Sequence, residues 1–297
     1  MTRGPAVVLL LGGALVLAGC GGSDKATNGK LAAPFAYDAA RPFQLESKPT
    51  KIGGDGVEVR DITFAGPGKS PLHAYLASPS GSGSHPAVIY AHGGGGDREE
   101  LLEEAVAMAR RGAVTLTLTM SYSPTRPTLV PPGLEGVRVN ATVDLEAVRE
   151  VRRTVDFLSS LSAVDEDRIA YVGWSAGART GAIVAGADHR IQAFDLLAGG
   201  ALPMSRYIAQ APEAWRPELE TLFAEIDPLR YVAHAAPSAL FFQDGSKDEV
   251  MSREELTTLA REGSDPKELR WYDSGHVPTA QTWADSRRWL AERLDLG

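Results

Sequence analysis

A serine flanked by glycines is the residue in this sequence best suited to covalent chemistry. Residues 173–177 read Gly-Trp-Ser-Ala-Gly, the G-x-S-x-G pattern. An apolar, strand-like run leads into Ser175, and a helix-like stretch, 176–187, follows it. The flanking glycines permit a sharp turn, because a Cβ on either would collide with neighbouring backbone. This strand–turn–helix context predicts a nucleophilic Ser175, whereas the five letters alone would also suit a plain turn that ends a strand.

A serine hydroxyl is a poor nucleophile near neutral pH, so it needs a base, and the base needs an orienting acid. When the serine lies in a turn of this kind, the chain order is serine, acid, histidine. Three histidines follow the serine, namely His189, His234 and His276. His276 comes after a strand-like run, in a flexible loop at the sheet edge where ligands usually bind. We therefore expect His276 to be the base, in preference to His189 at a helix end and His234 before a strand.

The orienting acid is expected just past the strand-like run 239–243. Three carboxylates follow that run, namely Asp244, Asp248 and Glu249. Asp244 is close enough to the strand end to be the first residue of a turn. Asp248 lies farther along, which leaves the loop room to reach His276. The sequence favours Asp248, with Asp244 and then Glu249 as alternatives.

The tetrahedral intermediate of such a reaction needs hydrogen-bond donors for its oxyanion. One donor should be the backbone N–H of Ala176, directly after the serine. The other should come from the glycine run 93–96, which follows a strand and has no side chains to cover its backbone amides. Gly94 is the preferred donor and Gly93 the alternative. His92 precedes the serine in the chain, so we expect it to be a structural hydrogen-bonding residue.

The rest of the chain must position these residues, and from residue 57 onward it alternates between strand and helix patterns. Strands are predicted at 57–64, 72–77, 87–91, 114–118, 168–174, 193–198, 238–243 and 268–272. Helices are predicted at 99–111, 139–161, 176–187, 252–262 and 279–294. This alternation predicts an α/β domain whose mainly parallel, eight-stranded sheet carries helices on both faces. Antiparallel pairing is expected only in the first hairpin.

A small lid is expected in the segment 202–236, which connects two of the predicted strands across the carboxyl edge of the sheet. The segment carries four large apolar side chains, Met204, Tyr207, Trp215 and Phe223. They would line a pocket for a short acyl chain, unless they simply pack the segment onto the core. Trp215 and Trp174, the latter beside the serine, are the candidate pocket residues.

The N-terminal region has the pattern of an export signal. A short basic start and an apolar run end in Leu-Ala-Gly-Cys at 17–20, which resembles the bacterial lipobox. We therefore expect residues 1–19 to be removed. Cys20, the only cysteine, is then expected to carry lipid such as palmitate. The alternatives are an ordinary secretory signal and an uncleaved anchor. Residues 20–50 are predicted to be a flexible polar tether, and residues 51–297 the folded domain. This organisation predicts a membrane-anchored lipoprotein on the extracytoplasmic side of the cell envelope.

The charge balance narrows the range of partners. The chain has a formal net charge of −8 and no basic stripe, which argues against nucleic-acid binding and against attachment to anionic lipid by charge. The acidic pairs at 99–100 and 103–104 suit a solvated helix face better than a metal site. No metal or organic cofactor is expected.

Further segments accompany the serine motif. They are Pro79, 86–93 (PAVIYAHG), 164–169 (VDEDRI), 227–231 (DPLRY), 245–250 (GSKDEV) and 274–276 (SGH). On these residues about four fifths of the chain resembles the α/β-hydrolases, and it is similar to their dienelactone hydrolase/prolyl-oligopeptidase-like branch. The resemblance implies the α/β-hydrolase fold and a triad of Ser175, Asp248 and His276.

The chain departs from both named relatives. Ala178 stands where the oligopeptidases carry a second glycine, and the chain has no room for their β-propeller. The dienelactone hydrolases use a cysteine where this chain has Ser175. The expected function is therefore a serine esterase that acts on a small-molecule carboxylic ester. A peptidase, a thioesterase or acyltransferase with the same triad, and a non-catalytic binding lipoprotein are the alternatives.

Overall fold

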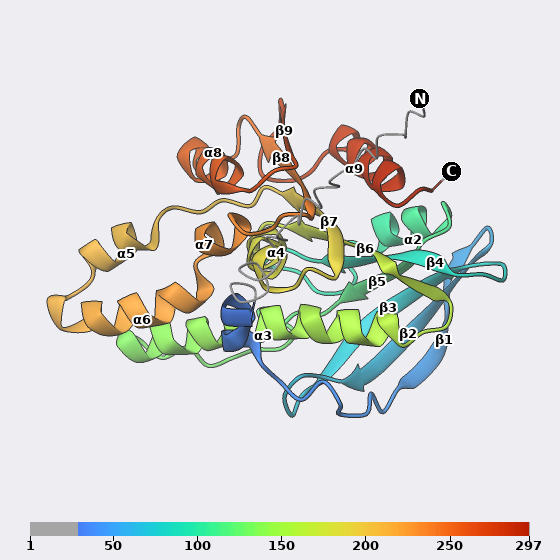
Figure 1. The fold of residues 1–297 in the computed structure, drawn as a ribbon, viewed down its shortest axis with the longest axis horizontal. Coiled ribbons are helices and arrows are strands. Elements are labelled where there is room, and N and C mark those ends of the chain that lie inside the picture. The colour runs from blue at the N-terminus through green and yellow to red at the C-terminus, as the bar shows by residue number, and fades with distance from the viewer. Residues whose placement is uncertain (1–28, 297) are drawn as a thin grey trace, which may run out of the picture.

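The computed structural model describes residues 29–296, which form one mixed α/β domain around a nine-stranded sheet (Figure 1). The strands are β1 (Glu46–Gly54), β2 (Val57–Ala65), β3 (Pro71–Pro79), β4 (His85–Ala91), β5 (Val114–Leu118), β6 (Val164–Trp174), β7 (Ile191–Leu197), β8 (Ala239–Gly245) and β9 (Lys267–Tyr272). The helices are η1 (Ala33–Phe35), α2 (Leu102–Ala109), α3 (Leu134–Ser159), α4 (Ala176–Ala187), α5 (Met204–Gln210), η2 (Glu213–Trp215), α6 (Arg216–Ile226), α7 (Pro228–Val232), α8 (Arg253–Glu262) and α9 (Ala280–Arg293).

The strands are arranged in the order β1-β2-β3-β5-β4-β6-β7-β8-β9. Pairing is parallel from β5 through β4, β6, β7 and β8 to β9. The central strands are apolar along their length because helices cover both of their faces. Parallel strands place their carboxyl ends at one edge, so the loops after β4, β6, β7, β8 and β9 meet there.

The side chains of β4 alternate between the two faces of the sheet and therefore belong to two different parts of the hydrophobic core. Ala87, Ile89 and Ala91 pack with residues of α3, α4, α7 and α8. Val88 and Tyr90 point the other way and pack with residues of α2 and α9. This alternation is the period of two expected of a strand, with apolar partners on both sides. Helix α4, which follows the serine, is thereby buried between α3 and α7 in the centre of the molecule (Figure 1).

The sheet is larger and less parallel than the sequence predicted. It has nine strands instead of eight, because β1 pairs antiparallel with β2. Antiparallel pairing also continues beyond the first hairpin, since β3 pairs antiparallel with β5. The sequence pattern missed β1 because its side chains are exposed or only half-buried and therefore carry no apolar alternation.

The prediction that residues 20–50 form a flexible tether is wrong for the part that the structure describes. Leu31 and Phe35 are buried in the main core. Three arginines of α3 donate hydrogen bonds to main-chain carbonyls of residues 34–41. The pairs are Arg149 to Pro34 at 2.7 Å, Arg152 to Phe35 at 2.8 Å, and Arg153 to Ala39 at 3.0 Å and also to Arg41. These bonds and the two apolar contacts hold the segment on the domain.

The predicted lid segment folds as α5, η2, α6 and α7, which connect β7 to β8. In Figure 1, α5 and α6 lie at the end of the molecule opposite β1, β2 and β3, beyond the carboxyl edge of the sheet. Helix α6 packs on α3 as well as on α5. The lid is therefore a helical insertion supported by α3.

Two predictions about the N-terminus, the signal at residues 1–19 and the lipidated Cys20, lie outside the described residues, as does the start of the tether. Within residues 29–296, no helix combines the length and the apolar character that crossing a membrane would require.

Candidate active site

The turn between β6 and α4 presents Ser175 at the carboxyl edge of the sheet. Ser175 has φ 55° and ψ −110°, a backbone conformation that non-glycine residues rarely adopt. A Cβ on Gly173 would lie 2.5 Å from the carbonyl carbon of Gly177. A Cβ on Gly177 would lie 2.3 Å from the carbonyl oxygen of Ala91. The two glycines are thus required by close backbone contacts on either side of the serine, as the sequence predicted.

Two hydrogen bonds join Ser175, His276 and Asp248 into a chain. Nε2 of His276 lies 2.9 Å from Oγ of Ser175. Nδ1 of His276 lies 2.9 Å from Oδ2 of Asp248. The other carboxylate oxygen of Asp248 accepts hydrogen bonds of 2.8 Å from the amides of Val250 and Met251, which hold the carboxylate in position. The structure brings together the three residues that the sequence favoured.

The two alternative acids have different surroundings. Glu249 accepts a hydrogen bond from the backbone N–H of His276 at 3.2 Å, so it contacts the histidine through the main chain only. Asp244, in β8, is buried, and its Oδ2 has no hydrogen-bond partner among the described residues. Burial, together with the nearby Asp248, raises the pKa of Asp244 to about 8. Asp244 is therefore mainly protonated at neutral pH, while Asp248 alone contacts the imidazole.

The remaining histidines lie away from this hydrogen-bond chain. His189 follows the far end of α4, and His234 is exposed beyond α7. His92 is buried, and its Nε2 accepts a hydrogen bond from the Met120 amide at 3.0 Å. Burial lowers the pKa of His92, which keeps its ring neutral. His92 therefore has the structural role predicted from the sequence.

Two backbone amides near the serine are candidates for the oxyanion donors. Ala176 is the first residue of α4, so its N–H has no carbonyl partner within the helix. A Cβ on Gly94 would lie 3.9 Å from the Ala176 Cβ, which shows that these two residues are neighbours. The Gly93 amide instead donates to Glu100 at 2.7 Å. The Gly94 amide has no hydrogen-bond partner among residues 29–296, so of the two predicted glycines it is the one available as a second donor.

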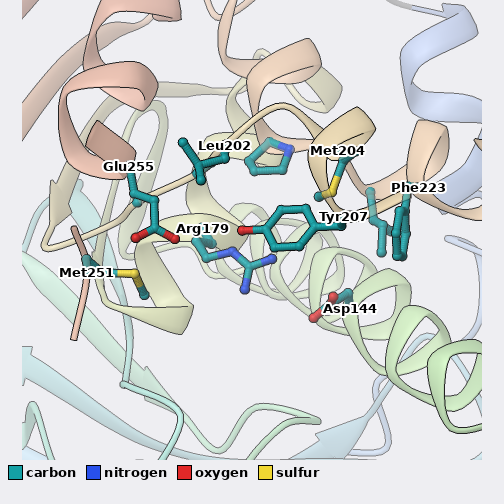
Figure 2. Close-up of a pocket in the computed structure, with 12 residues that line it drawn as sticks. Asp144, Arg179, Leu202, Met204, Tyr207, Phe223, Met251 and Glu255 are labelled. Atoms are coloured by element: carbon teal, nitrogen blue, oxygen red, sulfur yellow. The ribbon is translucent and has the colours of Figure 1, made fainter. Parts of the chain in front are cut away.

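A cavity of about 260 Å³ lies beneath the lid, one helical turn along α4 from the serine. Twelve residues line it: Asp144, Arg179, Gly200, Ala201, Leu202, Met204, Tyr207, Phe223, Ile226, Pro228, Met251 and Glu255. In Figure 2 the labelled side chains are arranged around Arg179. The lid thus contributes apolar walls to a cavity next to the site, and three of its four large apolar residues take part.

Neither tryptophan predicted for the pocket lines this cavity. Trp215 lies against the start of α3, where a Cβ on Gly133 would be 3.7 Å from its ring. Trp174 donates a hydrogen bond from its indole N–H to the main-chain carbonyl of His276 at 3.1 Å. Trp215 faces α3, the helix that supports the lid, and so takes no part in this cavity.

Two residues of the site were missed by the sequence analysis. Arg179 lines the cavity from α4, and Glu100 binds the Gly93 amide. Glu100 was interpreted as part of a solvated helix face, although it precedes α2 and bends back toward the glycine run. The position of Arg179, four residues after the serine, is the one signal that could have identified it, because this spacing places it one helical turn from the nucleophile.

Comparisons with known proteins identify the fold. No protein-family profile and no curated protein matches this sequence. Among solved structures, an acetyl xylan esterase from a Paenibacillus species has a TM-score of 0.73 at 19% identity, covering 91% of this chain and 94% of its own. An acetyl xylan esterase from a Thermoanaerobacterium species has a TM-score of 0.71 at 16% identity, covering 92% and 94%.

A protein named as a dienelactone hydrolase, from Klebsiella pneumoniae, is also similar, with a TM-score of 0.59 at 13% identity and coverage of 84% and 98%. The domain described above therefore has the α/β-hydrolase fold, with a nine-stranded, mostly parallel sheet. Identities of this size identify a fold and leave the reaction to be argued from the site itself.

Proposed function

We propose that this protein is a serine hydrolase of the dienelactone hydrolase-like branch that cleaves carboxylic esters. The observation that carries the proposal is the hydrogen-bond chain from the Ser175 hydroxyl through the His276 imidazole to the Asp248 carboxylate, with both distances at 2.9 Å. This is the geometry that makes a serine hydroxyl nucleophilic at neutral pH. The esterase names of the structural neighbours agree with it.

In the first half of the reaction, Ser175 Oγ attacks the ester carbonyl while Nε2 of His276 takes its proton. Asp248 holds the imidazole in the required tautomer and stabilises the imidazolium that forms. The amides of Ala176 and Gly94 donate to the oxyanion. Collapse of the tetrahedral intermediate breaks the ester C–O bond, and His276 returns the proton to the departing alcohol. The acyl group stays on Ser175.

In the second half, water attacks the acyl-enzyme. His276 removes a proton from that water, a second tetrahedral intermediate forms, and its collapse releases the carboxylic acid and regenerates the Ser175 hydroxyl. All proton transfers are carried by the residues named above. The cavity beneath the lid would receive the acyl chain, and its volume of about 260 Å³ favours short chains.

Labelling with a fluorophosphonate probe tests this proposal, because the probe reacts only with a serine that has been activated. Wild-type protein is expected to be labelled and to hydrolyse ethyl esters, and Ser175→Ala is expected to lose both properties. Ser205→Ala is a matched control, since Ser205 belongs to exposed α5. An unlabelled wild-type protein with no ester hydrolysis would instead indicate a non-catalytic binding protein on this fold.

We further propose that the enzyme works outside the cytoplasm, attached to the membrane by lipid on Cys20. The lipobox-like residues 17–20 support this proposal. Cys20→Ser is expected to move the protein out of the membrane fraction while each molecule keeps its hydrolytic rate. Absence of label from wild-type protein after growth with a palmitate analogue would contradict the proposal.

A further inference from the structure

Arg179 is a cation that lines the lid cavity. Its guanidinium makes no hydrogen bond or ion pair with any side chain or carbonyl of residues 29–296. In Figure 2 it lies near the centre of the labelled side chains, between Tyr207 and Asp144. Arginine stays charged at all accessible pH values and presents a planar set of donors that matches a carboxylate. Such a group in a cavity is suited to binding an anion.

The position of Arg179 relates it to the nucleophile. It is the fourth residue of α4, and its backbone N–H donates a hydrogen bond to the Ser175 carbonyl at 3.1 Å, which closes the first turn of the helix. Helical side chains also lean toward the helix N-terminus, which in α4 is the end next to Ser175. One turn advances about 5.4 Å along the axis. Arg179 is thus about one helical turn from the serine, a distance that a short acyl chain on the serine oxygen can span.

Two carboxylates share the cavity with Arg179, and neither neutralises it by direct contact. Glu255 accepts a hydrogen bond from the Ser252 amide at 2.8 Å, which completes the capping box of α8. Burial raises the pKa of Asp144, and the charge of Arg179 opposes that shift. Tyr207 adds a hydroxyl to the same cavity. Arg179 therefore remains available to an anionic ligand, with Asp144 as its competitor.

We infer that Arg179 binds a free carboxylate at the far end of the substrate's acyl group. The substrate would then be a half-ester of a short dicarboxylic acid, with its methylene groups against Leu202, Phe223 and Ile226. This inference rests on the proposed ester hydrolysis. Ser175 would form the acyl bond as the ester C–O bond breaks, and water would then release the dicarboxylate. The distal carboxylate takes no part in the bond changes.

A matched pair of ethyl esters tests the inference. Monoethyl succinate carries the distal carboxylate, and ethyl 4-methylpentanoate has an uncharged isopropyl group of similar shape in its place. Hydrolysis is followed by released ethanol, and the ratio of the two kcat/KM values is compared among variants. Wild-type protein is expected to prefer monoethyl succinate. Arg179→Met is expected to lower the ratio about 10- to 100-fold, mainly through KM, because a charge-assisted hydrogen bond is lost.

Three further variants sharpen the test. Arg206→Met removes the same charge from the lid at an exposed position that does not line the cavity, so the ratio should not change. Asp144→Asn removes the competing carboxylate and should raise the ratio. Arg179→Lys keeps the charge and should retain part of the preference. Thermal unfolding confirms that each variant is folded.

The outcomes separate this inference from the proposed function. Hydrolysis of ethyl 4-methylpentanoate with no preference for monoethyl succinate, and an unchanged ratio in Arg179→Met, would overturn the inference and leave the esterase proposal intact. If neither ester is hydrolysed and Ser175 is not labelled by the fluorophosphonate, the esterase proposal fails, and this inference fails with it.

Discussion

The indole N–H of Trp174 donates a hydrogen bond to the main-chain carbonyl of His276 at 3.1 Å, and the two rings lie 5.9 Å apart. Trp174 is the residue immediately before Ser175 in the chain. The bond therefore connects the strand that ends at the serine with the loop that carries the histidine. Together with the hydrogen bond from the His276 amide to Glu249, this bond helps to set the distance between Ser175 and His276.

We predict that Asp248 contributes far more to turnover than Asp244. Asp248→Asn should lower kcat on the order of 10⁴-fold, because the imidazole loses the carboxylate that holds its tautomer. Asp244→Asn replaces a carboxyl group that is already mainly protonated at neutral pH, so it should change kcat only slightly. Steady-state hydrolysis of one ethyl ester by both variants measures the difference. Loss of activity in Asp244→Asn together with normal activity in Asp248→Asn would reverse the assignment.

We predict that Asp244 makes the protein less stable as the pH rises. The folded-state pKa of about 8 is higher than the ordinary value of 3.8, so the folded protein retains a proton that the unfolded chain releases. The free energy of unfolding should therefore fall between about pH 4 and pH 8. The asparagine in Asp244→Asn cannot ionise, so the variant should lose this part of the dependence of its unfolding free energy on pH. The difference in free energy of unfolding between Asp244→Asn and wild type should therefore change with pH. It should be more favourable to the variant at pH 9 than at pH 4, by on the order of a few kcal/mol.

Denaturant unfolding across this pH range measures the effect. Asp265→Asn is a suitable control, because Asp265 is an exposed loop residue. Parallel pH profiles for wild type and Asp244→Asn would show that Asp244 ionises normally in the folded protein.

We predict that Glu249 is a positioning residue. Its carboxylate accepts a hydrogen bond from the His276 amide at 3.2 Å, and a Cβ on Gly275 would lie only 2.6 Å from the same oxygen. Glu249→Ala should let the loop shift and lower kcat by about 10-fold with little change in KM, since the acyl cavity is untouched. Glu249→Gln keeps an acceptor and should recover most of the rate.

The exposed Glu254 supplies the control, and Glu254→Ala should leave kcat and KM unchanged. The ratio of the effects on kcat and KM is a further readout, because a loss of fold would lower the amount of active enzyme and leave KM unchanged in every variant alike. An equal loss in Glu249→Ala and Glu249→Gln would show that the charge, and not the hydrogen bond to His276, is required.

We predict that Phe223 limits the length of the acyl chain. Phe223 lines the lid cavity, whereas Trp215 lies outside it against α3. Phe223→Ala should enlarge the cavity and move the optimum of ethyl ester hydrolysis from short toward longer chains. Trp215→Ala removes a comparable aromatic ring from the same lid and should leave the profile unchanged. A series from acetate to octanoate measures both variants, and a shift with Trp215→Ala alone would indicate that the cavity does not bind the acyl chain.

The sequence by itself determined the features that depend on local chemistry. The glycines on both sides of Ser175 are required by backbone contacts within one turn, and the same turn gives Ser175 its positive φ. The strands from β2 to β8 are visible because burial on one or both faces leaves apolar periodicity. The chain order of serine, acid and histidine, together with the position of His276 in a loop after a strand-like run, selected His276 as the candidate base.

Only the tertiary structure decided which distant groups meet. Asp244, Asp248 and Glu249 are all carboxylates of one short segment, and the fold of that segment determines which of them contacts the imidazole, which binds the main chain and which is buried. Strand β1 carries no apolar pattern because its stability comes from backbone pairing with β2. Arg179 and Trp215 are similar cases, since the path of the lid over α3 and α4 determines whether a side chain enters the cavity. Sequence patterns record the burial of each residue, whereas the choice of partner depends on how loops that are far apart in the chain pack together.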